Sequence, residues 1–133
     1  MYKFHKDGTL PTNNEIFVFG SNLNGIHGAG AAKVAQEKFG AVWGKGVGPY
    51  GKSLAIPTKG YLMETLPLDT IKKYILIFVN DSPKFMPDVN FFVTRVGCGL
   101  AGYRDEQIAP FFKGAQNCSF AEQWREYLEE WKF

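Results

Sequence analysis

A chain of 133 residues that is 45% apolar and 21% charged has the balance of one folded domain, which excludes a disordered protein and makes a cross-link unnecessary. Its two cysteines exclude a disulfide framework and lack the spacing of zinc ligands, and its longest apolar run is too short to cross a membrane. The net charge of +2, without an arginine cluster or interleaved aromatic residues, disfavours a nucleic-acid groove. We therefore expect a single soluble, cytoplasmic domain over residues 1–133, with no signal peptide, membrane partner, metal or cofactor.

The first half of the chain predicts a strand, a helix and a second strand. Residues 15–20 have the aromatic and β-branched content of a strand. Residues 30–40 place apolar side chains at helical spacing, with Gly40 as the stop. Five glycines within residues 40–51 predict a loop, and residues 53–58 predict the second strand.

The second half continues this alternation. A helix is expected from Pro67 onward, with an apolar face. Residues 90–96 predict a third strand, apolar enough for the middle of a sheet, and residues 108–112 predict a short helix. The last predicted helix covers residues 119–133. It begins with a capping box, Ser119 with Glu122. Its apolar stripe consists of Phe120, Trp124, Tyr127, Leu128 and Trp131. Such alternation predicts a layered α/β domain with a largely parallel or mixed sheet.

Positive charge is concentrated in residues 20–60. This segment contains five lysines and one acid, Glu37, so it carries +4 and leaves −2 for the rest of the chain. A local positive field favours an anionic ligand, although each lysine by itself is more typical of a solvated surface.

All three predicted strands run into small or polar residues. The segments FVFG, LAIPT and FFVTRV are followed by SNLNGIHGAG, KG and GCGLAGY. In open α/β sheets a ligand binds beyond the carboxyl ends of the strands, so one site would collect all three segments. Gly28, Ala29 and Gly30 would then form the first turn of a helix, whose unpaired N–H groups attract anions. Tight packing of the helix on the strand explains these glycines equally well, and their spacing fits neither a P-loop nor G-x-G-x-x-G.

The stretches HGAGAAKVAQEKFGA and TRVGCGLAGY resemble the macrodomain superfamily, in the branch of terminal ADP-ribose protein glycohydrolase and the ADP-ribose 1″-phosphate phosphatases. That branch opens its first ligand loop and helix with GAGIA…FG and closes a later strand with PRIGCGL. The similarity covers roughly residues 16–112. It implies a three-layer α/β/α fold with a mixed central sheet, which binds ADP-ribose or a related NAD-derived nucleotide at the strand ends. An ADP-ribosylated protein is a further partner that the resemblance implies.

Carried over by position, the resemblance also implies a set of ligand-binding residues, which are Gly20, Ser21, Asn22, Asn24, Gly28, Ala29, Gly30, Lys59, Gly97, Cys98, Gly99, Leu100 and Ala101. Lys59 matches the lysine that attacks the anomeric carbon of the ribose in the glycohydrolase. A lysine nucleophile must lose its proton, which burial or nearby positive charge promotes by lowering its pKa. The alternative is a plain phosphate-binding or surface lysine.

The sequence departs from the glycohydrolase at Ala101, where that enzyme has the aspartate that handles protons and resolves the covalent intermediate. Alanine cannot transfer a proton, so the mechanism is incomplete unless Asp105 or Glu106 reaches the site; both are also suited to begin a helix. Besides the lysine, Asn22 and His27 are catalytic candidates. His27 would act as a base near neutral pH, or it only hydrogen-bonds its own loop.

Two further features have competing interpretations. Residues 44–51 predict a flexible lid over the cleft, with Tyr50 or Trp43 stacking on adenine or only anchoring the loop. Cys98 is a small packed residue or a reactive thiolate. The leading hypothesis is binding of an ADP-ribose-like nucleotide. Hydrolysis of ADP-ribosyl linkages or of ADP-ribose 1″-phosphate is the first alternative, and a partner-binding protein with a vestigial cleft is the second.

Overall fold

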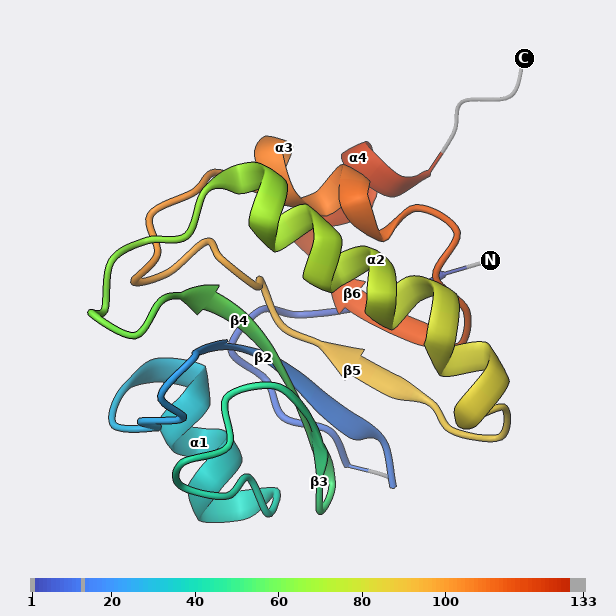
Figure 1. Cartoon of the computed structure of the whole chain (residues 1–133). Helices are drawn as coiled ribbons and strands as arrows, with labels where there is room; N and C mark the ends of the chain where they lie inside the picture. Colours follow the sequence, from blue (N-terminus) through green and yellow to red (C-terminus); the bar gives the residue numbers. More distant parts are fainter. Residues whose placement is uncertain (1, 13, 130–133) are drawn as a thin grey trace.

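Six strands form one mixed sheet in the computed structural model, which describes residues 2–12 and 14–129 (Figure 1). The strands are β1 (Lys3–His5), β2 (Ile16–Asn22), β3 (Gly48–Tyr50), β4 (Ser53–Lys59), β5 (Phe91–Val93) and β6 (Cys118–Ala121). Their order across the sheet is β1-β6-β5-β2-β4-β3. All neighbouring pairs are parallel except β3 and β4, so the expected mixed sheet is confirmed.

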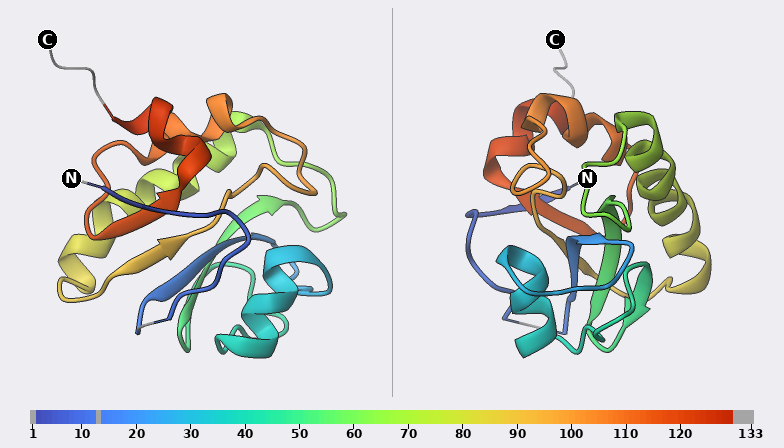
Figure 2. Two further views of the ribbon diagram at one scale, coloured as in Figure 1. Left: turned by 180° about the vertical axis from the view of Figure 1, so that it is seen from behind. Right: turned by 60° about the vertical axis from the view of Figure 1, so that its left-hand side comes forward.

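Helices cover both faces of this sheet and complete three layers, α/β/α (Figure 2). One face carries α1 (Gly30–Lys38), and the other carries α2 (Leu68–Phe85), α3 (Asp105–Ile108) and α4 (Arg125–Leu128). Side chains alternate between the two faces of a strand. In β2, Phe17 and Phe19 therefore pack beneath α1, whereas Val18 joins the larger core beneath α2. The predicted α/β fold class is confirmed.

The helix α2 follows from its sequence pattern. Ile71, Ile75, Phe78 and Val79 recur at helical spacing and are buried against the sheet. Burial of each such side chain contributes roughly 1.5–3 kcal/mol. Pro67 occupies the N-cap position directly before the helix, one residue earlier than the first-turn position that we expected.

The C-terminal segment corrects the prediction of one long helix. Cys118–Ala121 forms β6, which lies between β1 and β5, and all four of its residues are buried. Ser119 is therefore a strand residue whose hydroxyl lies 2.7 Å from His5 Nδ1, and it caps no helix. A short 3₁₀ turn, Glu122–Trp124, and α4 follow. Phe120 and Trp124 of the predicted stripe are core residues, as expected, whereas Trp131 lies outside the described residues.

Two short edge strands were not predicted from the sequence. β1 pairs with β6, and β3 pairs antiparallel with β4 within the segment that we assigned to a loop. β3 includes Pro49, which is tolerated because β3 is the edge strand of the sheet. Within residues 2–12 and 14–129, no helix combines the length and apolarity that crossing a bilayer requires.

The topology creates a crevice at the centre of the sheet. β2 and β5 are parallel neighbours, but the chain leaves β2 for α1 on one face and leaves β5 for α3 on the other. The two connections diverge, so the carboxyl ends of these strands border an open space. This is the position at which open α/β sheets bind ligands.

Candidate functional site

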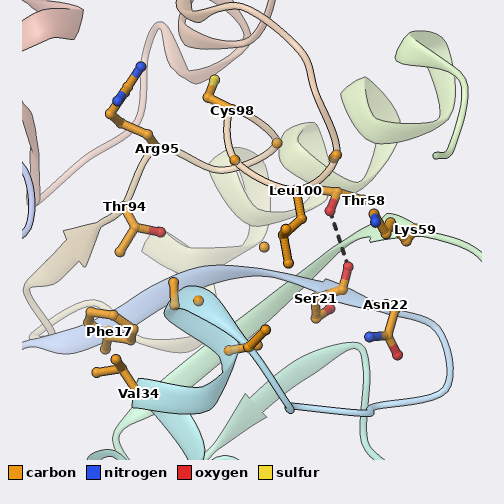
Figure 3. Close-up of a pocket in the computed structure, with 18 of the residues that line it drawn as sticks. Phe17, Ser21, Asn22, Val34, Thr58, Lys59, Thr94, Arg95, Cys98 and Leu100 are labelled. Carbon is orange, nitrogen blue, oxygen red and sulfur yellow. Dashed lines mark hydrogen bonds between the residues drawn. The ribbon is translucent and has the colours of Figure 1, made fainter. Parts of the chain in front are cut away.

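A cavity of about 650 Å³ occupies this crevice (Figure 3). It lies between the N-terminus of α1, the carboxyl ends of β2 and β4, and the loop that follows β5. Of the expected ligand-binding residues, those in the lining are Gly20, Ser21, Asn22, Gly28, Ala29, Gly30, Lys59, Gly97, Cys98, Gly99, Leu100 and Ala101. The three segments that we expected to converge therefore border one cavity. Asn24 and His27 are not part of its lining.

The first turn of α1 faces the cavity without a side-chain cap. Ala29 is the N-cap residue and has extended backbone, with φ −153°, but its methyl group cannot accept a hydrogen bond. The first turn also contains no acidic residue. Gly28, Ala29 and Gly30 all line the cavity, so the end of the helix that leaves N–H groups unpaired borders it. The helix dipole adds partial positive charge at the same place.

Four glycines at the cavity fall into two classes. Gly20 is packed, because an added Cβ would lie 3.4 Å from Gly97 N and from the Thr58 methyl group, and Gly97 has a left-handed φ of +77°. Gly28 and Gly99 are different: an added Cβ would meet nothing within 4 Å, and neither residue has a positive φ. Helix–strand packing therefore does not explain Gly28. Both glycines leave room inside the cavity for another molecule to approach the backbone.

Lys59 lies at one end of the cavity. The register between β2 and β4 shifts at Ser21/Asn22, which pairs Asn22 with Lys59. The Lys59 backbone also accepts a hydrogen bond from Leu23 N at 2.9 Å, so its position is fixed. The side chain is half-buried and lines the cavity. Among the described residues, no carboxylate lies within 4.0 Å of its ammonium group.

Asn22 and Asn24 both hold loops in place. The Asn22 amide donates to Ile26 O at 2.8 Å and accepts from Ile26 N at 3.0 Å, which closes the turn that leads to the glycines. The Asn24 amide donates to Tyr61 O at 2.6 Å and ties this turn to the loop after β4. Asn22 lines the cavity, as expected. Asn24 is not among the lining residues, contrary to expectation.

His27 packs against a neighbouring loop and lies outside the lining of the cavity in which we predicted it to act as a base. Its side chain is buried at 2% exposure, and Nε2 lies 3.1 Å from Val42 O and 3.2 Å from Lys45 O. The ring also packs edge-on against Phe19. No atom of His27 lines the cavity. The alternative prediction was a histidine that hydrogen-bonds its own loop, whereas the carbonyl groups that Nε2 contacts belong to Val42 and Lys45.

These same contacts correct the predicted lid. His27 and the Ser21 hydroxyl, which donates to Gly46 O, hold residues 42–46 beside the loop that follows β2. Trp43 is 58% exposed and Tyr50 belongs to β3, and neither lines the cavity. The glycine-rich segment therefore supports the cleft from the side and does not cover it.

Cys98 fits the interpretation as a packed residue. Its side chain is half-buried, and burial raises the pKa of the thiol to about 12, so the thiolate is not formed at neutral pH. The thiol lies 3.6 Å from Val96 O, to which it donates. In Figure 3 its sulfur points away from α1, so the residue borders the cavity mainly through its backbone.

An ion-pair network fixes the loop after β5. Arg95 donates to both carboxylate oxygens of Asp105, at 2.8 and 2.7 Å, and to Asp7 at 3.2 Å. Asp105 also accepts from the Trp124 indole at 2.7 Å. Burial acts to raise the pKa of Asp105, but the hydrogen bonds from Arg95 and Trp124 outweigh it and lower the pKa. As expected, Asp105 and Glu106 begin α3, and neither carboxylate lines the cavity in place of the missing aspartate.

Replacing Asp105 by Asn should lower the free energy of unfolding by about 1.5–3 kcal/mol at pH 7, the range for losing hydrogen bonds to a charged group. The lowered pKa means that the carboxylate stabilises the fold above its unfolded pKa of about 3.9. That contribution is lost as the pH falls through the folded-state pKa. Urea unfolding at pH 7 and at low pH measures the difference, with the exposed Asp88→Asn as the control. Equal losses for both variants would contradict the network's role.

The far end of the cavity was not predicted from the sequence. It is apolar and aromatic, with Phe17, Val34 and Phe92 in its lining. The His5 ring stacks on Phe92 with centroids 3.7 Å apart, and burial lowers the pKa of His5 to about 4, so it is neutral at pH 7. Asp7 and the following turn complete this wall. The sequence signal in this segment is the Asp7-Gly8 pair, which is typical of a turn.

Comparisons with known proteins find no relative: no family model matches the chain, and no curated protein or solved structure is significantly similar to it. In the part of the chain that the structure describes, no group of three or more His, Cys, Asp or Glu side chains is arranged to hold a metal ion. The function must therefore be inferred from the geometry and chemistry of the cavity.

Proposed function

We propose that the cavity binds ADP-ribose or a closely related NAD-derived nucleotide. The proposal depends on one observation. Gly28 and Gly99 border the same cavity, an added Cβ at either residue would meet no protein atom within 4 Å, and the N-terminus of α1 beside them has no side-chain cap. Backbone N–H groups in such a turn favour phosphate. The space left by the absent side chains suits phosphate oxygens, which must approach within hydrogen-bond distance of the backbone.

The two ends of the cavity suit the two ends of such a ligand. A volume of about 650 Å³ lies within the usual range for small-molecule sites. Phe17, Val34 and Phe92 form an apolar end that suits a flat nucleobase, with His5 as a neutral hydrogen-bonding group beside it. Polar groups and Lys59 lie at the other end, which suits a sugar hydroxyl or a phosphate (Figure 3). The diphosphate then lies between them. The resemblance in residues 16–112 supports a nucleotide ligand at the same strand ends.

Binding without turnover fits the titratable groups of the lining better than hydrolysis does. Asp7 is paired with Arg95, Cys98 is protonated at neutral pH, and Ala101 offers no carboxylate. Among these lining residues, no unpaired carboxylate or thiolate is therefore available as a general base for cleavage of a glycosidic or phosphate bond. The Lys59 amine in the lining keeps hydrolysis of an ADP-ribosyl linkage as the second candidate.

Titration calorimetry with ADP-ribose, ADP and AMP tests the proposal. We expect saturable binding of ADP-ribose, with weaker binding of AMP because it lacks the second phosphate. Chromatography of the same samples after incubation with an ADP-ribosylated peptide measures turnover, and released ADP-ribose would favour the hydrolase. The absence of heat at millimolar ADP-ribose would contradict the proposal and leave a partner-binding protein with a vestigial cleft.

A further inference from the structure

The turn that borders the cavity at the start of α1 has few contacts of its own. Gly28 and Gly30 have no side chains, and an added Cβ at either residue would meet no protein atom within 4 Å. Ala29 is exposed and forms no side-chain cap. Of residues 27–30, only His27 is buried. The contacts of the His27 side chain therefore anchor this turn to the rest of the protein.

The His27 ring reaches a second loop through one of its two nitrogen atoms. Nε2 lies 3.1 Å from Val42 O and 3.2 Å from Lys45 O. Because both partners are acceptors, we assign the ring hydrogen to Nε2, which donates to them. Nδ1 is buried and has no hydrogen-bond partner in the part of the chain that the structure describes. The ring therefore acts as a single donor that ties the turn to residues 42–46.

Residues 42–46 are themselves fixed, because their backbone packs directly on the backbone of the loop that follows β2. Gly44 N donates to Gly25 O at 2.9 Å. An added Cβ at Gly25 would overlap backbone atoms of Gly44 and Lys45. An added Cβ at Gly46 would overlap Asn22 O. No side chain fits between the two loops, so the carbonyl groups that accept from the imidazole belong to a rigid support.

We propose that His27 is a positioning residue, whose hydrogen bond to residues 42–46 holds residues 28–30 in the conformation that receives the phosphates. His27 lies outside the lining of the cavity, so it acts through the glycine backbone that follows it. A glycine turn without an anchor samples more conformations, and its ordering upon binding lowers the affinity for the ligand. The inference rests on the proposed nucleotide binding and adds a residue that contributes from outside the cavity.

Titration calorimetry with ADP-ribose tests this inference on His27→Leu and His27→Gln. Leucine fills the buried space but has no donor, so the affinity should fall about tenfold, the cost of ordering roughly one backbone residue. Glutamine carries an amide Nε2 that can donate to the same carbonyl groups. It should therefore restore the affinity to within about threefold of the wild type.

Two further measurements separate positioning from a general loss of stability. Adenosine has no phosphate, so its affinity, measured by NMR titration, should be the same in the wild type and in both variants. Ile75→Val is the matched control, because Ile75 is fully buried in α2 on the opposite face of the sheet from α1. This change lowers stability without touching either loop and should leave the affinity for ADP-ribose unchanged.

The wild-type protein offers a test that does not depend on the folding of a variant. The proton on His27 Nε2 should exchange slowly with solvent, both before and after ADP-ribose is added, whereas the amide NMR signals of Gly28 and Gly30 should shift. Rapid exchange of the Nε2 proton, an equal fall in adenosine affinity, or no recovery in His27→Gln would overturn this inference while nucleotide binding stands. Failure of ADP-ribose to bind the wild type would overturn both proposals.

Discussion

Replacing Gly28 by valine is expected to abolish binding of ADP-ribose and to leave the fold intact. An added Cβ at this position meets no atom of the protein within 4 Å, and Gly28 lines the cavity, so we expect the new side chain to occupy the space proposed for a phosphate. Overpacking against the ligand and the loss of charge-assisted hydrogen bonds together cost about 3 kcal/mol or more, a loss above about 100-fold in affinity. Titration calorimetry measures the affinity.

Gly28 is a cleaner position for this test than Gly30. Gly30 has a left-handed φ of +58°, so valine there would strain the start of α1 as well as fill the cavity. Gly28→Val should change the free energy of unfolding by less than about 1 kcal/mol, because its backbone has no positive φ. Gly99→Ala tests the opposite wall in the same way. Unchanged affinity in a folded Gly28→Val protein would contradict close approach of a ligand to this turn.

Lys59→Ala is expected to weaken nucleotide binding by about 1–3 kcal/mol, or roughly 5- to 150-fold, the range for loss of a charge-assisted hydrogen bond. Its ammonium group lies at the cavity end and has no carboxylate of the described residues within 4.0 Å, so an anionic ligand is its natural partner. Calorimetry at two salt concentrations measures the effect, which should shrink at high salt.

Lys45→Ala is the matched control for this variant. Lys45 belongs to the same basic segment, but its side chain is exposed and lies outside the lining. It should reduce affinity little. A similar loss for both variants would show that the lysines act only through a general positive field, and Lys59 would then have no direct contact with the ligand.

Local sequence patterns were sufficient for the part of the fold that surrounds the glycine segments. β2, α1 and β4 were predicted nearly to their ends, because their apolar spacing is strong and Gly40 ends the helix with a left-handed φ of +77°. The cavity itself followed from the positions of three strand ends. These features depend on the preferences of adjacent residues and on one general rule of sheet topology.

Features that depend on distant contacts were not predicted. Cys118–Ala121 is a strand because β1 and β5 flank it, although its residues continue smoothly into the helical spacing of Trp124 and Leu128. The role of His27 is set by two carbonyl groups 15 and 18 positions away, which no local pattern reveals. The aromatic end of the cavity needs β1, and three residues are too few for a strand signal.

The pairing of β1 with β6 also limits when one wall of the cavity can form during synthesis of the chain. His5 and Ser119 are 114 positions apart and meet at 2.7 Å, so the aromatic end of the cavity lacks a wall until both have been synthesised. Contacts of such wide separation form late and slowly during folding. The β2–α1–β4 segment ends at Lys59, so it leaves the ribosome long before β6, which completes the wall formed with β1.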